Sequence, residues 1–141
     1  MQDSNCIFCK IIQGTSPSYK VWEDSDYVAF LSIQPIKPGH TLVVPKEHTD
    51  YLFDLPEKTY QGLFEAGRKL ARPLQAVTQS NRVGLMAEGF GVPHANLHLV
   101  PMTKGGEMNF SKSVKGIPEE LSQIQEKIKR AIELMEKVQK S

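Results

Sequence analysis

The residues best suited to chemistry in this sequence are its histidines, which are few and unevenly placed. The chain has four of them, and two, His94 and His98, flank Asn96 in the segment HANLHLV. Because successive side chains of a strand point to opposite faces, a strand here would place these three polar side chains in one row, about 7 Å apart. The apolar residues that alternate with them would then face the core: Ala95, Leu97 and Leu99.

A glycine-containing loop precedes this row and strengthens the case for an anion site. It reads Gly89-Phe90-Gly91-Val92. Glycine lets backbone N–H groups approach an anion closely, and such amides beside imidazole and carboxamide side chains suit a phosphate group. The alternative is an ordinary polar face on a half-exposed strand. We favour the phosphate site because the other two histidines, His40 and His48, flank a second short strand, GHTLVVPKEH.

The two cysteines, Cys6 and Cys9, form a Cys-x-x-Cys pair near the start of the chain. This spacing is typical of half of a tetrahedral zinc site, and it also occurs in redox pairs. Thioredoxin-like redox pairs begin a helix that follows a strand in a βαβ unit, whereas this pair opens the chain. A zinc site is therefore the better interpretation, and it needs two more ligands.

Composition narrows the function further. The net charge is formally +1, which argues against a broad electrostatic surface for nucleic acid. The N-terminus is polar, and no run approaches the ~18 apolar residues of a membrane-spanning helix. We expect a cytoplasmic protein with one domain over residues 1–141, no membrane partner and a local site for any nucleotide ligand.

The pattern along the chain predicts the scaffold that positions these residues. Expected elements are a short helix over 5–13, strands over 19–23, 27–33 and 41–45, a helix from about Pro56, strands over 83–87 and 94–100, and an amphipathic helix from Pro118 to about Val138. Asp54 is a possible cap for the central helix, and Pro73 is expected to kink or break it. The apolar residues expected on the buried side of the central helix are Tyr60, Leu63, Phe64, Leu70, Leu74 and Val77. Those expected on the buried side of the C-terminal helix are Leu121, Ile124, Ile128, Ile132, Met135 and Val138. This order indicates an α+β fold: an antiparallel sheet with one central helix, a short N-terminal helix and a C-terminal helix.

Three separated motifs resemble one known family, the histidine triad proteins. Their signature is His-x-His-x-His followed by two apolar residues, and residues 94–100 read His-Ala-Asn-Leu-His-Leu-Val. The segment AFLSIQPIKPGHTLVVPKEH is similar to the first half of these proteins, and CIFCKII is similar to the start of their bacterial members. The likeness runs from about residue 6 to residue 101, and residues from about 102 to 141 are a variable helical extension.

The resemblance implies a reaction and also a defect in it. In the family, the middle histidine attacks the α-phosphorus of a nucleotide, forming a covalent nucleotidyl-histidine that water resolves. Asn96 stands at that position here, and a carboxamide nitrogen is neither basic nor nucleophilic near neutral pH. His98 matches the triad histidine that contacts the scissile phosphate, and His40 matches a buried histidine behind the nucleophile.

The resemblance also implies the ligands of a metal and the walls of a nucleotide pocket. By resemblance to the zinc-bearing members, a structural Zn²⁺ would be bound by Cys6, Cys9, His48 and His94. Ser32 stands where many members have a ribose-binding aspartate, and Gly91 and Val92 would supply backbone amides to the phosphate. The apolar wall around the base would come from Ile7, Phe8, Ile11, Phe30 and Ile33, which could instead be plain core residues.

The sequence departs from the family in the loop before the triad, which usually reads Gly-Gln-Ser-Val.

Three functions stay open. The chain is a nucleotidyl hydrolase or transferase disabled by a deliberate replacement at Asn96, a natural nucleotide-binding or sensing module, or a zinc-stabilised interaction protein. We favour the first because the scaffold otherwise looks intact. Family members commonly form two-fold dimers, so we also expect a homodimer.

Overall fold

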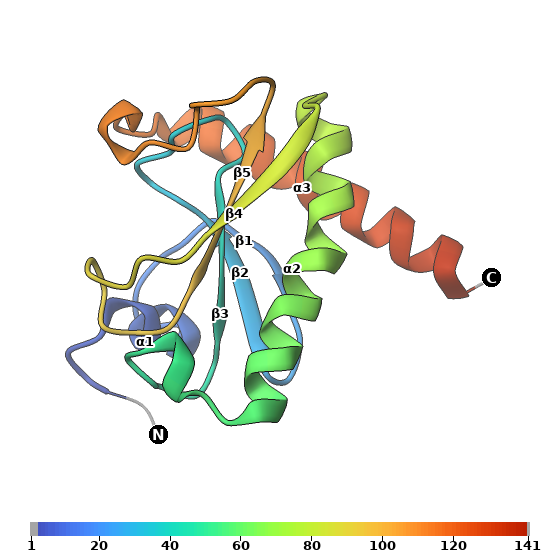
Figure 1. The fold of residues 1–141 in the computed structure, drawn as a ribbon. Helices are drawn as coiled ribbons and strands as arrows, with labels where there is room; N and C mark the ends of the chain where they lie inside the picture. Colours follow the sequence, from blue (N-terminus) through green and yellow to red (C-terminus); the bar gives the residue numbers. More distant parts are fainter. Residues whose placement is uncertain (1–2, 141) are drawn as a thin grey trace.

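A computed structural model describes residues 3–140, which form three α-helices and one five-stranded antiparallel sheet. The α+β prediction is confirmed (Figure 1). The strands lie in the order β1-β2-β3-β5-β4. The elements are α1 (Ile7–Gln13), β1 (Lys20–Glu23), β2 (Tyr27–Leu31), β3 (Thr41–Pro45), α2 (Glu57–Thr78), β4 (Arg82–Met86), β5 (Leu97–Met102) and α3 (Pro118–Lys140), with short 3₁₀ turns at Leu52–Asp54 (η1) and Phe110–Lys112 (η2).

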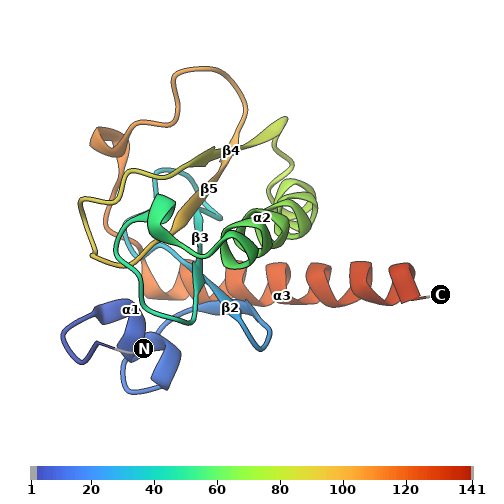
Figure 2. The same ribbon diagram turned by 60° about the horizontal axis from the view of Figure 1, so that its bottom comes forward.

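The sheet separates two apolar clusters. One contains Ala29, Leu31 and Val43 and packs against α2 and α3. The other contains Val28 and Phe30 and packs against α1. Because both faces are covered, all five residues of β2 are buried and its sequence YVAFL shows no polar alternation. Figures 1 and 2 show α1 and α2 on opposite sides of the sheet.

The central helix α2 differs from the sequence prediction at its cap, and it is not broken at Pro73. Asp54 lies in η1, and the residue that precedes the helix is Pro56, which makes no side-chain capping hydrogen bond. Pro73 does not break the helix, which continues as one element to Thr78. The proline ring removes one backbone hydrogen bond, but its burial in the core near the helix end offsets that loss. The predicted buried side is confirmed at Leu63, Leu70 and Leu74.

The C-terminal helix α3 follows the predicted periodicity over most of its length. Leu121, Ile128 and Ile132 are buried in the core shared with α2. Val138, which was expected on the same buried face, is 74% exposed because the last turns extend past the body of the molecule (Figure 1). No helix among residues 3–140 combines the length and apolar character needed to cross a membrane.

The strand expected over 94–100 begins later, at Leu97. The backbone N–H of Ala95 donates to Thr49 O, so this segment pairs with the turn after β3 before the ladder starts. Side-chain alternation nevertheless extends back through it. Ala95 and Leu97 pack in the core on the α2 side, whereas the His94 ring contacts Phe8 of α1.

Candidate functional site

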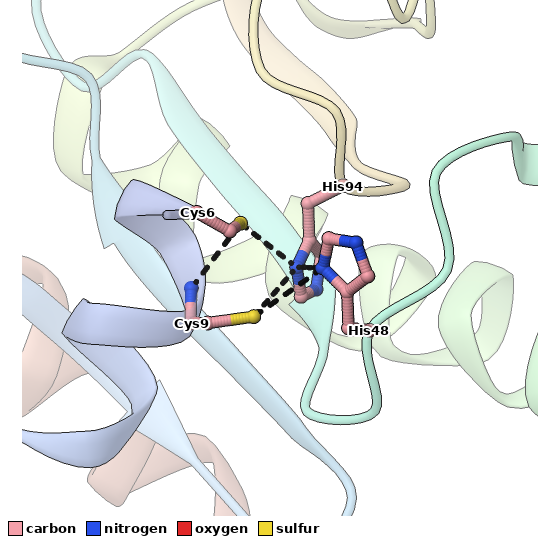
Figure 3. A group of neighbouring side chains, drawn as sticks. All are labelled: Cys6, Cys9, His48 and His94. Carbon is pink, nitrogen blue, oxygen red and sulfur yellow. Dashed lines mark hydrogen bonds between the residues drawn. The ribbon is translucent and has the colours of Figure 1, made fainter. Parts of the chain in front are cut away.

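Four side chains converge between α1 and the sheet: Cys6, Cys9, His48 and His94. Their ligand atoms all lie within 4.8 Å of one another (Figure 3). Cys9 Sγ lies 3.3 Å from His48 Nδ1 and 3.5 Å from His94 Nδ1. The two imidazole Nδ1 atoms are 3.2 Å apart, and Cys6 Sγ lies 3.4 Å from His94 Nδ1. The structure brings together the four residues predicted from the sequence.

These distances fit a tetrahedral metal ion. Zinc bonds of ~2.05 Å to nitrogen and ~2.3 Å to sulfur imply ligand separations of about 3.3 Å for two nitrogens and about 3.5 Å for nitrogen and sulfur. In the cluster the two nitrogens are 3.2 Å apart and the nitrogen–sulfur distances are 3.3–3.5 Å, which match these two expected values. Two thiolates with two imidazoles are a donor set that zinc prefers, so the cluster can hold Zn²⁺. A redox pair needs no imidazoles around it.

The atoms behind the ligands are arranged for metal binding as well. His94 Nε2 lies 2.8 Å from Pro45 O, which can only accept, so Nε2 carries the proton and Nδ1 is left as the ligand atom. Burial lowers the pKa of His94, which keeps the ring neutral. Backbone N–H groups of Cys9 and Asp3 donate to Cys6 Sγ and Cys9 Sγ, each at 3.4 Å. Burial raises the pKa of the Cys9 thiol, so a bound cation is needed to hold it as thiolate.

Local structure explains how each ligand is placed. Cys6 is the N-cap of α1, and Cys9 follows within its first turn. Gly14, at φ +81°, ends the helix after seven residues. His48 comes from the turn after β3, and the backbone N–H of His94 donates to Val92 O at 2.8 Å. Three separate chain segments therefore meet at the cluster (Figure 3).

Asn96 lies two residues after His94, and the residue is buried, with 7% of its surface exposed. Its Nδ2 donates to His94 O at 2.8 Å. Within residues 3–140, Asn96 Oδ1 is a buried side-chain oxygen for which the structure gives no hydrogen-bond partner. An unsatisfied buried acceptor of this kind costs about 1–3 kcal/mol. Residue 96 therefore carries an amide whose nitrogen is hydrogen-bonded and whose oxygen has no partner among residues 3–140.

His98 and His40 form a hydrogen-bonded pair beside Asn96. The Ile36 backbone N–H donates to His40 Nδ1 at 3.0 Å, so the proton of the neutral His40 ring is on Nε2. That Nε2 lies 2.9 Å from His98 Nδ1 and donates to it, which leaves the His98 ring proton on its own Nε2. Burial lowers the pKa of His40 to about 4, aided by repulsion from His98, and burial also lowers the pKa of His98.

His40 is buried, and its two ring nitrogens are hydrogen-bonded to the Ile36 backbone N–H and to His98. Gly39, at φ +90°, forms the turn that delivers His40 to β3, and an added Cβ there would lie 2.8 Å from Thr78 Cγ2. The sheet register, which pairs Leu42 with His98, then brings the two histidines together.

Two residues of the segment after β5 were not predicted from the sequence, and one of them, Phe110, lies beside this pair. The ring centroid of Phe110 lies 5.0 Å from that of His98 and 6.4 Å from that of His40. Glu107 holds the same loop in place by accepting hydrogen bonds from the Thr103 and Lys104 backbone N–H groups and from Lys37 Nζ. These partners lower the pKa of Glu107 to about 2. Both residues lie in the segment interpreted as a variable extension, and no local pattern marks them.

The residues expected around the nucleotide divide into buried and exposed sets. Phe8, Ile11 and Phe30 are buried in the cluster between α1 and the sheet, and the Phe8 and Phe30 rings meet edge to face with centroids 5.3 Å apart. Ile7 and Ile33 are 42% and 65% exposed. Ser32 Oγ accepts from the Gln34 backbone N–H, and Gly91 and Val92 lie in the loop between β4 and β5.

Comparison with known proteins settles the family. The HIT domain family matches residues 13–105 of this chain. The chain belongs to the HIT family. Among similar members is the adenosine 5'-monophosphoramidase HNT1 of Saccharomyces cerevisiae, 38% identical over 103 residues, which are 70% of this chain and 63% of the yeast protein.

Solved structures of HIT proteins agree with the fold and with the cluster. A zinc-bound histidine triad family protein from Mycobacterium smegmatis superposes with a TM-score of 0.84 at 27% identity, covering 95% of this chain and 97% of that one. A protein from Sulfolobus tokodaii, described as a hypothetical histidine triad nucleotide-binding protein, superposes with a TM-score of 0.83 at 26% identity, covering 92% of this chain and 93% of that one. The zinc-bearing type of HIT protein fits the Cys6, Cys9, His48 and His94 cluster of this chain.

Proposed function

We propose that this HIT protein binds a nucleotide at the face of β5, on the scaffold of a nucleotidyl hydrolase or transferase that Asn96 deprives of its nucleophile. The observation that carries the proposal is the Asn96 carboxamide beside the His40–His98 pair. The names of similar proteins support the ligand class, since one is named an adenosine 5'-monophosphoramidase and another a hypothetical nucleotide-binding protein.

Each residue has a task in this proposal. His98 offers its Nε2–H to a phosphate oxygen, and the amides of Gly91 and Val92 approach the same group. Ser32 contacts the ribose, more weakly than a carboxylate would. The base lies against the apolar residues predicted for it, Ile7, Phe8, Ile11, Phe30 and Ile33. Zinc on Cys6, Cys9, His48 and His94 is structural, because four protein ligands leave no open position.

Asn96 can perform one of the two roles that a histidine would have at this position, donation of a hydrogen bond to His94 O. An imidazole at this position could donate its Nδ1–H to His94 O, as Asn96 Nδ2 does, and present Nε2 to the α-phosphorus. The imidazole would form a P–N bond while the leaving group departs with its electron pair, and water would later cleave that bond. The carboxamide oxygen cannot take this part, so the chain as written is a disabled form. A natural nucleotide-binding or sensing module is the alternative.

Asn96→His is the variant that tests the proposal. Turnover of a nucleoside phosphoramidate or a dinucleoside polyphosphate should rise by a factor of about 10³ or more, because a nucleophile acts as a unit with its neighbours. The measurement is a rate on a nucleotide panel, with mass spectrometry for an adduct on residue 96. Asn96→Gln, an amide of similar size with no nucleophile, is the matched control and should stay inactive.

The result separates the three functions. If the chain as written binds nucleoside monophosphates in calorimetry and Asn96→His turns substrate over, the disabled-enzyme interpretation is supported. Binding without turnover in Asn96→His would favour the natural binding module. Absence of binding to every purine and pyrimidine monophosphate would leave the interaction protein.

A further inference from the structure

The loop over residues 103–112, which follows β5, is fixed to the rest of the molecule at two places. Near its start, the buried Glu107 carboxylate accepts hydrogen bonds from two backbone N–H groups of the loop and from Lys37 Nζ, which lies 2.9 Å away. Near its end, the centroid of the Phe110 ring lies 5.0 Å from that of the His98 ring. The loop therefore covers His98 from one side.

Met108 lies between these two fixed places and packs over a glycine of β4. A Cβ added at Gly84 would overlap the sulfur atoms of both Met108 and Met102. The two thioethers therefore meet at the position where any other residue would carry its side chain. Gly84 does not have a positive φ, so the backbone itself does not require glycine here. What requires glycine is the space that the two sulfur atoms occupy.

This position suits a thioether but not its oxidised form. Met108 is only partly buried, so a small oxidant has access to its side chain. Oxidation to the sulfoxide turns a flexible apolar group into a larger and polar one. Above Gly84 the new oxygen would face a second sulfur, which donates no hydrogen bond, in a space that has no room for an added atom. The oxidised side chain is therefore expelled from this position.

We propose that Met108 is a site of reversible oxidation by hydrogen peroxide, and that its sulfoxide releases the loop over residues 103–112 from His98. The sulfur lone pair attacks one peroxide oxygen, so that an S–O bond forms and the O–O bond breaks. The departing hydroxide takes the proton of the transferred oxygen and leaves as water. Sulfur is oxidised by two electrons and the peroxide is reduced by two. This inference goes beyond the proposed function, and its test needs no nucleotide.

Hydrogen–deuterium exchange of the full chain, before and after treatment with hydrogen peroxide, tests the proposal. Mass spectrometry of peptides should find one added oxygen on Met108. The amides of residues 103–112 should then exchange about tenfold faster or more, because the loop opens more often. In NMR, the His98 ring signals, which the nearby Phe110 ring displaces, should shift at the same time. Methionine sulfoxide reductases A and B together should reverse all three changes.

Two leucine variants separate this site from the rest of the chain. Met108→Leu keeps an apolar side chain of similar size over Gly84 but cannot be oxidised there, so peroxide should leave the exchange of its loop unchanged. Met135→Leu removes a partly buried methionine of α3 and should respond to peroxide as the original chain does. Both variants keep Cys6 and Cys9, so any effect of peroxide on the thiols is common to them and cancels in the comparison.

Three results would overturn the proposal. The first is a Met108 that stays unmodified at peroxide doses that oxidise the other methionines. The second is a Met108 sulfoxide that leaves the exchange of residues 103–112 and the His98 signals unchanged. The third is a Met108→Leu loop that opens under peroxide as far as the original loop does, because the oxidation that opens it would then lie elsewhere.

Discussion

Each histidine of the site is defined by the partner of its second ring nitrogen. Pro45 O fixes the proton of His94 and leaves Nδ1 for a metal, whereas the Ile36 N–H fixes the proton of His40 and makes that ring a donor. The same residue type thus serves as ligand at one place and as an orienting group at another. Burial keeps His40 neutral, with a pKa of about 4 against 6.5 for an exposed histidine.

That shift predicts a pH-dependent stability. Between pH 6.5 and about 4 the unfolded chain binds a proton at His40 that the folded chain does not, so the free energy of unfolding should fall as the pH falls through this window. His40→Gln, which does not titrate, should be less stable at neutral pH but should lose less stability on acidification. Urea unfolding between about pH 7 and about pH 4.5 measures both slopes.

Zinc release at low pH affects both proteins alike, so the decisive quantity is the difference between the two curves. Parallel curves for the original chain and His40→Gln would mean that His40 is not the group that titrates.

Among the secondary-structure elements, prediction succeeded where a pattern is local. The strand over 41–45 and the helical period of Leu63, Leu70 and Leu74 were readable because burial on one side imposes them. The start of β5 could not be predicted in this way, because the Ala95 N–H donates to the backbone oxygen of Thr49, 46 positions earlier in the chain. Position alone likewise could not show that Val138 lies beyond the body of the molecule.

The residues of the site likewise divide into those that could be predicted from the sequence and those that could not. The four zinc ligands were predictable since their types and spacings match a known arrangement. Phe110 and Glu107 were not, because their roles depend on a loop folding back over His98 and onto Lys37. No periodicity or motif records such a contact between distant segments.

The helix α1 is the element that depends most on zinc. It has only seven residues, too few to be stable alone, and two of the four ligands belong to its first turn or its cap. It also carries Phe8 and Ile11, which cover Phe30 and which we assign to the base pocket. Removing zinc should therefore loosen one wall of the nucleotide site.

We expect purified protein to carry about one zinc per chain. His48→Ala should lose the metal, melt about 5 °C lower or more, and bind nucleoside monophosphates about tenfold more weakly. His98→Ala is the control that should keep its zinc, since His98 lies outside the cluster. Elemental analysis and calorimetry make the measurements. Equal melting temperatures with and without a strong chelator would refute the zinc site.

At the scale of the whole molecule, the two edges of the sheet are unequal. Strand β1 at one edge is covered by α3, where Gln125 Nε2 donates to Lys20 O at 2.8 Å. Strand β4 forms the other edge, and its Leu85 is 45% exposed beside α2. An edge strand with an exposed leucine next to a helix is suited to pairing with a second copy of the chain.

We therefore expect the homodimer to join two β4 strands around a two-fold axis and to extend the sheet across both subunits. Leu85→Asp would place a charge at the centre of that contact and should weaken dimerisation at least about tenfold. Leu134→Asp alters a leucine of similar exposure, 57%, on α3, and should leave the dimer intact. Sedimentation velocity over a range of concentrations gives the dissociation constants. If the original chain is monomeric, the dimer itself is refuted. If Leu134→Asp breaks the dimer and Leu85→Asp does not, the interface lies on α3 instead, because a charge weakens dimerisation this strongly only where it is buried in the contact.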